Sequence, residues 1–297
     1  MDYIEIFSNS KDLTEGIFGQ CLIWIIEVLY YLEKINKIKN NTCVTFNINT
    51  LNNDNLIPKF IEPKILHNKI LEPTKIPLHK FYTETVSKDN LDVNFGSYNK
   101  ANKIFDKYFK FNDFIINEVN KLNINNKTLG VHYRGTDKNY DTSQANFITT
   151  KEMVLIVTDY IKNNDVEKIF CCSDEQVFIN EVTRLFPNKV IQYKQLRSPE
   201  AVNYGLFRYG QNNVNKDFLT NACIIDMLAL SKCKTVIKSS SALSCFSKIL
   251  NPSLQLYTVS AMKYPWFPTC VVNKYETSSE IIKKILNRTM KDDCFNK

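Results

Sequence analysis

The second part of the sequence alternates short apolar runs with longer amphipathic stretches, and this alternation constrains the fold more than any other feature. The apolar runs are rich in β-branched and aromatic residues and span 128–134, 168–173, 189–193, 235–239 and 254–259. Stretches with helical spacing follow them at 150–163, 175–186, 217–232, 242–250 and 277–291. Strands that alternate with helices in this way predict a parallel sheet covered by helices on both faces.

The chain opens with one unit of the same kind. A short strand is predicted at 2–7, and a turn that contains Gly16 and Gly19 follows it. Apolar residues three and four positions apart then predict a helix over 21–32, and the run 42–48 predicts a second strand. A strand, a glycine-bearing turn, a helix and a strand make the elementary step of a doubly wound sheet.

The region between these two patterns has a different composition. Residues 49–100 are rich in asparagine, lysine and proline, which predicts an irregular region with few long elements. A helical period returns over 101–122, and the residues just after it read as a link. We therefore expect an α/β protein with two Rossmann-like domains, an N-terminal one over 1–124 and a C-terminal one over 125–297.

The net charge limits the kinds of ligand that the protein is expected to bind, and the cysteine pattern indicates the cellular compartment. The 38 basic and 31 acidic residues give a net charge of +7, which suits an anionic ligand. The lysines are scattered rather than clustered, so we expect no nucleic-acid partner. The nine cysteines form no Cys-x-x-Cys pair and no cluster with zinc spacing. This pattern indicates reduced thiols and a cytosolic type of compartment.

The beginning of the sequence lacks the marks of export and of membrane anchoring. The segment "MDYIEIFSNS" has no basic region followed by an apolar one, as a signal peptide would. The most apolar stretch, 17–32, is interrupted by Gln20 and Glu27 and is too short for a membrane span. We expect a soluble, cytoplasmic protein with no signal peptide, no membrane anchor and no transmembrane segment.

Polar side chains follow three of the predicted strands of the second part. They are His132, Arg134, Asp137 and Lys138 after the first strand, Ser173, Asp174 and Glu175 after the second, and Ser239, Ser240 and Ser241 after the fourth. In open α/β sheets, ligands bind outside the carboxyl ends of the strands, so we expect these groups to meet at one edge. An arginine grips phosphate bidentately, and a helix N-terminus offers free N–H groups. The sequence therefore predicts a site for a phosphorylated ligand.

Each of these features also has a purely structural interpretation. Arg134 with Asp137 can form a surface ion pair, and His132 can be a hydrogen-bonded core histidine. The Ser173–Asp174 pair is typical of a helix N-cap, and the serines at 239–241 can be a cap and a turn. Asp226 can lie on a solvated helix face, although its sequence neighbours are apolar. The order of the features along the chain favours the functional interpretation.

Three segments resemble the fucosyltransferase superfamily, which includes α1,6- and α1,2-fucosyltransferases, the nodulation fucosyltransferase and protein O-fucosyltransferases. The segments are "HYRGTDK", "IFCCSDEQVF" and "IIDMLALSKCKTVIKSSSALSCFSKIL". The N-terminal "EGIFGQCLIWIIEVLYYL" is similar to the Gly-Phe-x-x-Gln opening that lines the donor cleft in that family. The resemblance implies a GT-B-like fold, with two Rossmann-like domains facing a cleft. It implies that the C-terminal domain binds a GDP-sugar and that the N-terminal domain forms the acceptor side.

The resemblance also implies roles for single residues. The donor-binding set is Gly16, Gly19, Gln20, His132, Arg134, Asp137, Ser173, Asp174, Asp226, Ser240 and Ser241. Within it, Arg134 would hold the β-phosphate, and His132 and Asp226 would bind guanine. Ser240 and Ser241 would contact the diphosphate.

The catalytic set implied by the resemblance is Arg134, Lys138 and Asp141, with Asp174 near the acceptor side. The α1,6 enzymes carry a glutamate base eight positions after the arginine, and here that position is Thr142. Asp141 precedes it and takes the role of the base if the loop shifts by one position. Otherwise another residue is the base, or the reaction depends on stabilisation of the leaving group. The chain has no Asp-x-Asp-like metal motif before the nucleotide pocket, so we expect no metal requirement and no cofactor.

Together these features predict an inverting glycosyltransferase that moves fucose from GDP-fucose to a glycan or protein hydroxyl, because one displacement needs one base. Three alternatives stay open at this stage. The first is an inactive GDP-sugar-binding protein, which the changed base position motivates. The second is a glycosyltransferase with a different nucleotide sugar. The third is an unrelated phosphate-binding α/β enzyme, against which the absence of Gly-x-Gly-x-x-Gly and P-loop motifs speaks.

Overall fold

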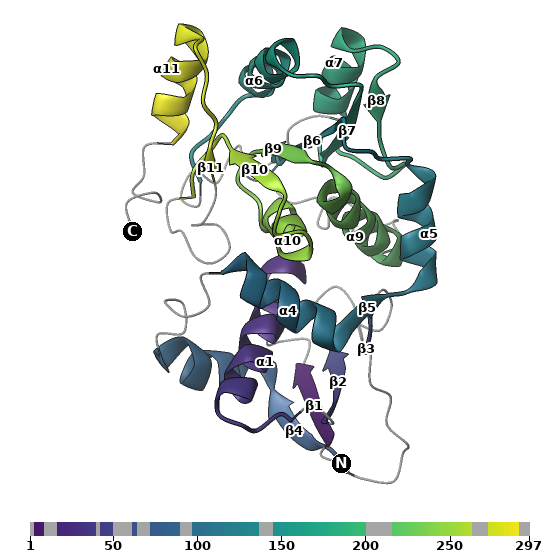
Figure 1. The fold of residues 1–297 in the computed structure, drawn as a ribbon, viewed down its shortest axis with the longest axis vertical. Coiled ribbons are helices and arrows are strands. Elements are labelled where there is room, and N and C mark those ends of the chain that lie inside the picture. The colour runs from purple at the N-terminus through teal and green to yellow at the C-terminus, as the bar shows by residue number, and fades with distance from the viewer. Residues whose placement is uncertain are drawn as a thin grey trace. The chain divides into compact units, whose positions relative to one another are not determined.

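The structure is a computed structural model of the 297-residue chain. It describes residues 3–8, 17–39, 42–49, 61–63, 72–89, 97–136, 145–199, 216–262 and 273–290. The chain divides into two compact units, Met1–Asn117 and Glu118–Lys297 (Figure 1). Each unit has its own parallel sheet.

The second unit is built on a sheet that has six strands in the described residues. They are β6 (Thr128–Tyr133), β7 (Lys168–Ser173), β8 (Val190–Ile191), β9 (Thr235–Lys238), β10 (Gln255–Thr258) and β11 (Asn273–Lys274). Their order is β11-β10-β9-β6-β7-β8, and every pairing is parallel. This is the strand order of a doubly wound nucleotide-binding sheet, in which the direction of winding reverses between β6 and β9.

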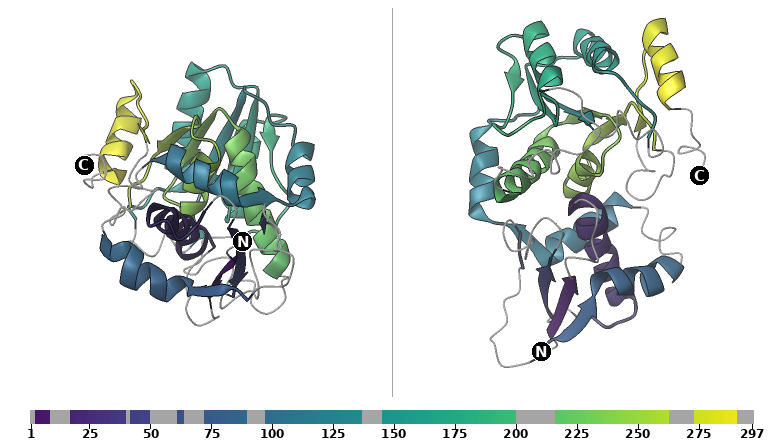
Figure 2. Two further views of the ribbon diagram at one scale, coloured as in Figure 1. Left: turned by 60° about the horizontal axis from the view of Figure 1, so that its bottom comes forward. Right: turned by 180° about the vertical axis from the view of Figure 1, so that it is seen from behind.

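Helices cover both faces of this sheet. They are α6 (Thr150–Asn163), α7 (Gln176–Leu185), α9 (Lys216–Lys232), α10 (Ala242–Leu250) and α11 (Glu280–Thr289). Figures 1 and 2 show α6, α7 and α11 on one face and α9 and α10 on the other. Alternate residues of β6 serve the two faces, because side chains alternate along a strand. Leu129, Val131 and Tyr133 join the core under α6 and α7, whereas Gly130 and His132 face α9 and α10.

These elements confirm the predicted α/β class and the parallel sheet covered by helices. Two helices have the predicted bounds, α6 and α10. A capping box begins α6, where Thr149 and Glu152 exchange hydrogen bonds between side chain and backbone, a pattern that the sequence carries as Thr-x-x-Glu. Strand β11 was not predicted, because its two residues, Asn273 and Lys274, are polar and exposed and lack the apolar run that marks the other strands.

The first unit holds a smaller sheet of three parallel strands in the order β2-β1-β4. These strands are β1 (Tyr3–Ser8), β2 (Cys43–Ile48) and β4 (Thr74–Pro77). A π-helical turn, η1 (Ile17–Ile23), leads into helix α1 (Trp24–Lys34), whose buried residues include Ile25, Val28, Leu29 and Leu32. The predicted strand, helix and second strand are therefore present in the order that the sequence indicated.

Short elements fill the rest of the first unit. They are β3 (Ile61–Pro63), α2 (Leu78–Phe81), η3 (Tyr82–Val86), η4 (Ser87–Asp89), α4 (Tyr98–Tyr108), β5 (Phe109–Phe111) and α5 (Asp113–Lys121), of which α5 continues into the second unit. The prediction of one helix over 101–122 was wrong, because β5 interrupts it and pairs antiparallel with β3. Tertiary packing decides the break, since Phe109 is buried and stacks on Phe46 with ring centroids 4.8 Å apart. Asn112 then starts α5 by accepting a hydrogen bond from the Ile115 N–H at 3.0 Å.

Seven cysteines lie in the described residues, and all seven are free thiols. Six of them are buried and Cys223 is half-buried. Burial raises the pKa of the Cys172 thiol well above its ordinary value, so this thiol stays protonated. In the part of the chain that the structure describes, no helix combines the length and the apolar character needed to cross a membrane.

The cap at Asn112 gives a direct test of the helix break. Asn112→Ala should lower the free energy of unfolding by about 0.5–2 kcal/mol, because the Ile115 amide loses its acceptor. Asn112→Asp keeps an oxygen at the same position and serves as the matched control in urea denaturation. Equal losses in the two variants would contradict the capping role.

Candidate functional site

The carboxyl ends of β6, β7 and β9 carry the polar residues that the sequence singled out. Strand β6 lies between β7 and β9, so the residues that follow the three strands are neighbours. The winding of the sheet reverses between β6 and β9, and this is the place where doubly wound proteins bind their ligands. We call this region the switch-point edge, and its central residues are His132, Arg134 and Ser239.

His132 ends β6 as a buried side chain with a defined partner. It is 5% exposed, and its Nδ1 lies 2.9 Å from the Ser244 hydroxyl of α10. Burial and the positive charges of Lys238 and Arg134 lower the pKa of His132 to about 3. The imidazole is therefore neutral at pH 7, and it can hydrogen-bond a ligand without adding charge.

Asp174 fixes the loop that follows β6. Its carboxylate accepts hydrogen bonds from the Gly135 N–H at 2.8 Å and the Thr136 hydroxyl at 2.6 Å. Its Oδ2 also lies 3.2 Å from Nη1 of Arg134. The residue just before helix α7 is Glu175, and it makes no side-chain cap, so the interpretation of Ser173–Asp174 as a plain helix cap was wrong. Asp174 instead joins β7 to the loop after β6.

Arg134 is held at its backbone and remains accessible at its side chain. Its N–H donates to the Ser239 hydroxyl at 2.7 Å, which ties it to the end of β9. Its side chain is 30% exposed, although Asp174 contacts one end of the guanidinium. A guanidinium fixed in this way carries a permanent positive charge in a planar group whose geometry matches a phosphate.

The three serines after β9 have different surroundings. Ser239 donates its N–H to the His132 carbonyl at 3.0 Å, and the Ser240 N–H donates to the Ser260 hydroxyl at 2.9 Å. Ser241 precedes α10 and makes no side-chain cap with the helix. A hollow of about 10 Å³ is lined by Arg134, Ser239, Ser240, Ser260 and residues 145–148. The first N–H groups of α10 begin next to this hollow and, like those of any helix, have no partner inside the helix.

Lys238 is a buried cation that the sequence analysis did not assign to the site. It is 1% exposed, and its ammonium donates to the Ser239 carbonyl at 3.0 Å. It is the direct neighbour of His132 across the β6–β9 pair, so both side chains lie on the same face of the sheet. No carboxylate of the described residues forms an ion pair with it. A buried ammonium without an acid makes the switch-point edge favourable for an anion.

Glu175 is an acid with a raised pKa beside the Arg134 loop. It is 3% exposed, and burial together with the charge of Asp174 raises its pKa to about 7. Its carboxyl group occupies the place that a side chain at position 135 would need, because a Cβ on Gly135 would lie 2.2 Å from it. A side chain at position 135 would therefore displace the Glu175 carboxyl group, which is the flexible end of that side chain.

Asp226 of α9 has one carboxylate oxygen without a partner in the described residues. It is 4% exposed, its Oδ2 accepts from the Gln195 amide at 2.7 Å, and its Oδ1 is the atom without a partner. Burial raises the pKa of Asp226 to about 7, although Arg197 and Gln195 act in the opposite direction. Arg197 is 9% exposed and has an Nε without a partner in the described residues. Buried polar atoms are normally hydrogen-bonded, so this acceptor and this donor are candidates for ligand contact.

The remaining predicted residues are not part of this geometry. Ser173 is buried and accepts from the Glu175 N–H at 3.0 Å, which makes a local turn. Gly16, Asp137, Lys138 and Asp141 lie outside the described residues. Gly19 and Gln20 belong to the backbone of η1, in the first unit.

The residues that sequence reasoning missed follow the same strand ends. Gln195 and Arg197 lie just after β8, in the segment "YKQLRS", and the rule that ligands bind at carboxyl ends could have found them. Lys238 was read as part of an apolar strand. A lysine inside a strand that is buried on both faces is unusual and was the available signal.

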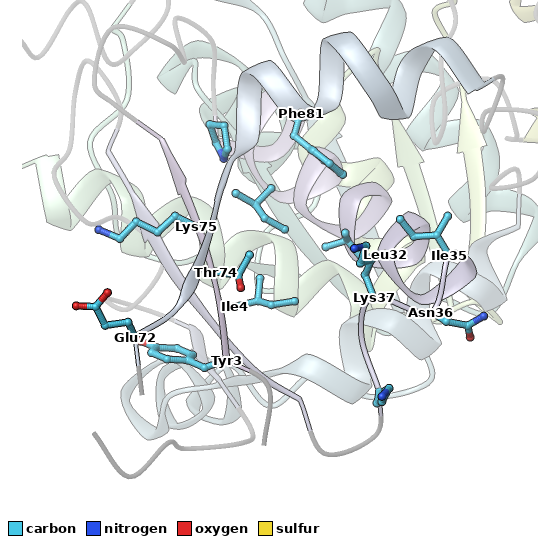
Figure 3. Close-up of a pocket in the computed structure, with 13 residues that line it drawn as sticks. Tyr3, Ile4, Leu32, Ile35, Asn36, Lys37, Glu72, Thr74, Lys75 and Phe81 are labelled. Carbon is cyan, nitrogen blue, oxygen red and sulfur yellow. The ribbon is translucent and has the colours of Figure 1, made fainter. Parts of the chain in front are cut away.

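A second hollow lies in the first unit, with a volume of about 710 Å³. The side chains of Ile4, Leu32 and Phe81 lie toward its centre, and those of Glu72 and Lys75 reach its edge (Figure 3). It is much larger than the hollow beside the switch-point edge. However, it is lined by the amino end of β1 and by all of β4 in the first unit, whereas the polar strand-end residues that the sequence singled out lie in the second unit. We therefore assign the chemistry to the switch-point edge.

In the described ranges, no group of three or more histidine, cysteine, aspartate or glutamate side chains is arranged to hold a metal ion.

Comparisons with known proteins identify the fold. No family model and no curated protein sequence matches the chain. Among solved structures, the fucosyltransferase NodZ from Bradyrhizobium is 15% identical, with 86% of this chain and 96% of that chain covered and a TM-score of 0.53. NodZ α-1,6-fucosyltransferase soaked with GDP-fucose is 16% identical, with 85% and 94% covered and a TM-score of 0.51. NodZ α-1,6-fucosyltransferase co-crystallised with GDP is 15% identical, with 86% of this chain and 94% of that chain covered and a TM-score of 0.51.

The predicted resemblance is therefore confirmed at the level of the fold, which is the GT-B type of these fucosyltransferases.

The buried acid on α9 makes a testable statement about stability. The folded pKa of Asp226 is about 7 and its ordinary value is 3.8, so the folded protein binds more protons between these pH values. The contribution of Asp226 to the free energy of unfolding therefore falls as pH rises from about 4 to about 7. Asp226→Asn removes this titration and keeps an acceptor for Gln195. We compare the free energy of unfolding of this variant with that of the wild type. The difference should favour the variant more at pH 8 than at pH 5, by on the order of 1–4 kcal/mol.

The measurement is urea denaturation of the wild type and of Asp226→Asn at pH 5, 6, 7 and 8. A difference between the two proteins that does not change with pH would show that Asp226 has an ordinary pKa.

Proposed function

We propose that the chain is an inverting glycosyltransferase that transfers fucose from GDP-fucose to a hydroxyl group of a glycan or a protein. The observation that carries the proposal is the cationic switch-point edge, where Arg134, Lys238 and the start of α10 come together. Such an edge suits the departing diphosphate of a nucleotide-sugar donor. The fold supports this donor, because proteins with the same fold have been solved with GDP and with GDP-fucose.

At the phosphate end, Arg134 is the central group. Transfer of a sugar from its donor leaves negative charge on the β-phosphate, and a fixed guanidinium stabilises that charge without having to move. Ser240 and Ser241 would contact the diphosphate beside the N-terminus of α10, whose dipole favours an anion. The buried positive charge of Lys238 adds to the attraction for the diphosphate without direct contact. These groups supply positive charge from the protein itself.

At the base end, Asp226 is the candidate for recognition of guanine. Guanine presents adjacent N–H groups at N1 and N2, which are donors to a carboxylate, whereas adenine carries no donor at either position. The Oδ1 atom of Asp226 is a buried acceptor without a partner in the described residues. Arg197 carries the complementary unused donor, which suits a guanine acceptor atom. His132 would hydrogen-bond the same base as a neutral ring.

The acceptor hydroxyl must lose its proton to a carboxylate, and we assign this role to Asp141, with Lys138 beside the donor. Glu175 is a second candidate, because a base works best when its pKa lies near the working pH and that of Glu175 is about 7. Asp174 is excluded from proton transfer in this scheme, since its carboxylate already receives three contacts. Its role is to position Arg134.

The test of the whole proposal is the variant Arg134→Ala. Transfer from GDP-fucose, measured as release of GDP in the presence of a mixed glycan and peptide acceptor pool, should fall about 10²–10³-fold in kcat/KM. Arg184→Ala is the matched control, because Arg184 is an exposed arginine that pairs with Glu181 on α7. EDTA should leave the rate unchanged, because the protein supplies the positive charge.

Three outcomes would contradict this proposal in different ways. Equal rates in Arg134→Ala and the wild type would remove Arg134 from the site. Binding of GDP-fucose without any turnover would favour an inactive GDP-sugar-binding protein. Loss of activity with EDTA would refute the metal-free mechanism.

Recognition of the base can be tested apart from turnover. Asp226→Ala should weaken binding of GDP about tenfold or more and leave binding of pyrophosphate nearly unchanged, because only GDP carries the N–H donors. Calorimetric titration of both ligands against the wild type and the variant measures the difference. An equal loss for the two ligands would mean that Asp226 supports the site without reading the base. Tighter binding of UDP-sugars than of GDP-fucose would keep the glycosyltransferase and reject the fucosyl donor.

A further inference from the structure

Three tyrosines from separate segments of the second unit meet away from the switch-point edge. Tyr160 belongs to the last part of α6, Tyr257 to β10, and Tyr275 to the segment after β11. The rings of Tyr257 and Tyr275 meet edge to face at 85°, with centroids 5.5 Å apart. The ring centroid of Tyr160 lies 6.3 Å from that of Tyr257, with an interplanar angle of 57°, and 6.2 Å from that of Tyr275, with an angle of 51°. The three rings therefore form a corner of aromatic surfaces.

Hydrogen bonds hold the corner in place. Tyr275 and Thr277 both donate to Oδ2 of Asp159, at 2.7 and 2.8 Å, and Tyr160 donates to the Thr235 hydroxyl at 3.1 Å. The Gln255 amide donates to the Tyr257 hydroxyl. Rings whose hydroxyls are fixed in this way need little ordering when a ligand arrives, and this lowers the cost of binding.

A hollow of about 300 Å³ opens beside the corner. Its lining consists of Asp159, Tyr160, Asn163, Asn164, Gln255, Tyr257, Tyr275, Glu276, Thr277 and Ser278. Among these described residues there are amides, hydroxyls and two carboxylates, and no lysine or arginine. The volume lies at the lower end of the range of about 300–1,000 Å³ typical of small-molecule sites.

The place of the hollow in the fold separates it from the donor site. Asn163 ends α6 and Gln255 begins β10, which places this part of the lining near the amino end of β10. The rest of the lining, Tyr275–Ser278, follows β11 at the edge of the sheet. Arg134 and Ser239 follow the carboxyl ends of the same sheet. A ligand in the hollow therefore contacts none of the groups assigned to the donor.

We propose that this tyrosine-lined hollow binds a neutral sugar unit of an oligosaccharide. A sugar ring has a face of C–H groups and a rim of hydroxyls. The face suits the half-buried rings of Tyr160 and Tyr257. The hydroxyls suit the Glu276 carboxylate and the Oδ1 atom of Asn163, whose Nδ2 donates to the Asp159 carbonyl at 2.9 Å. The carboxylates of Asp159 and Glu276 disfavour an anion, and the many polar groups disfavour a hydrocarbon.

The geometry disfavours the other ligand that aromatic rings and acids attract, a quaternary ammonium ion. Such a cation needs several ring faces around it at once. Here Tyr257 and Tyr275 contact each other edge to face and Tyr160 is tilted against both, so the rings form a corner and do not surround a cation. One oxygen of Asp159 is also already occupied by two hydroxyl donors.

The experiment is a titration of the full chain with each probe in the absence of donor, and heteronuclear NMR monitors binding. The probes are neutral tetrasaccharides of glucose, mannose, galactose and N-acetylglucosamine, with tetramethylammonium chloride as the cationic probe. At least one tetrasaccharide should bind saturably, and Tyr257→Ala should raise its apparent Kd at least about tenfold. Asn163→Ala, at an exposed position, should weaken the same complex and is expected to fold normally.

Leu155→Ala is the matched control, because Leu155 is 47% exposed on the same helix, α6, and does not line the hollow. Binding that is unchanged in both Tyr257→Ala and Asn163→Ala would place the sugar elsewhere and overturn the proposal. Binding of tetramethylammonium in preference to every tetrasaccharide, or no binding of any tetrasaccharide, would overturn it as well. Because the readout needs neither GDP-fucose nor turnover, its failure is distinct from failure of the proposed transferase activity.

Discussion

The carboxylate of Asp174 is the contact on which the switch-point edge depends. It receives the Gly135 N–H, the Thr136 hydroxyl and the Arg134 guanidinium, so the loop after β6 is fixed to the end of β7. The bond from the Arg134 N–H to Ser239 fixes the same loop to the end of β9. Three neighbouring strands thus hold one arginine. Replacement of Asp174 by an apolar residue would leave buried donors without an acceptor, which costs more than the loss of an ordinary hydrogen bond.

The carboxyl edge of the sheet in the second unit has a cationic region and, apart from it, a buried acid. Near β6 and β9, burial and two cations keep His132 neutral. Near α9, burial raises the pKa of Asp226 to about 7. A ligand with a diphosphate at one end and N–H donors at the other complements both environments, whereas inorganic phosphate complements only the first. This asymmetry is the physical reason to prefer a nucleoside diphosphate over a simple anion.

Local periodicity made most of the second unit predictable from the sequence. Strands and helices of ordinary length carry their own pattern, and the strand-end rule then gathered His132, Arg134 and Ser240 without any knowledge of contacts. The break before α5 was not predictable, because it depends on the stacking of Phe109 against Phe46, a residue more than sixty positions away. The Asp226 oxygen that has no partner in the described residues is equally invisible in a sequence, since it depends on how α9 lies against the segment after β8.

A parallel sheet has two ends, and this chain presents different chemistry at each of them. All strands of the six-stranded sheet run in one direction, so cationic groups at the carboxyl ends and the tyrosine-lined hollow near the amino end of β10 are kept apart by the length of the strands. No described side chain belongs to both sites. Thermodynamic coupling requires that each ligand favour one of two states of a shared element. The element common to both sites is β9, and it is a central strand that β6 and β10 pair on both sides. A nucleotide and an oligosaccharide should therefore bind to this unit independently. A sugar unit bound in the tyrosine-lined hollow would hold the rest of the oligosaccharide near the protein without changing the affinity for the donor.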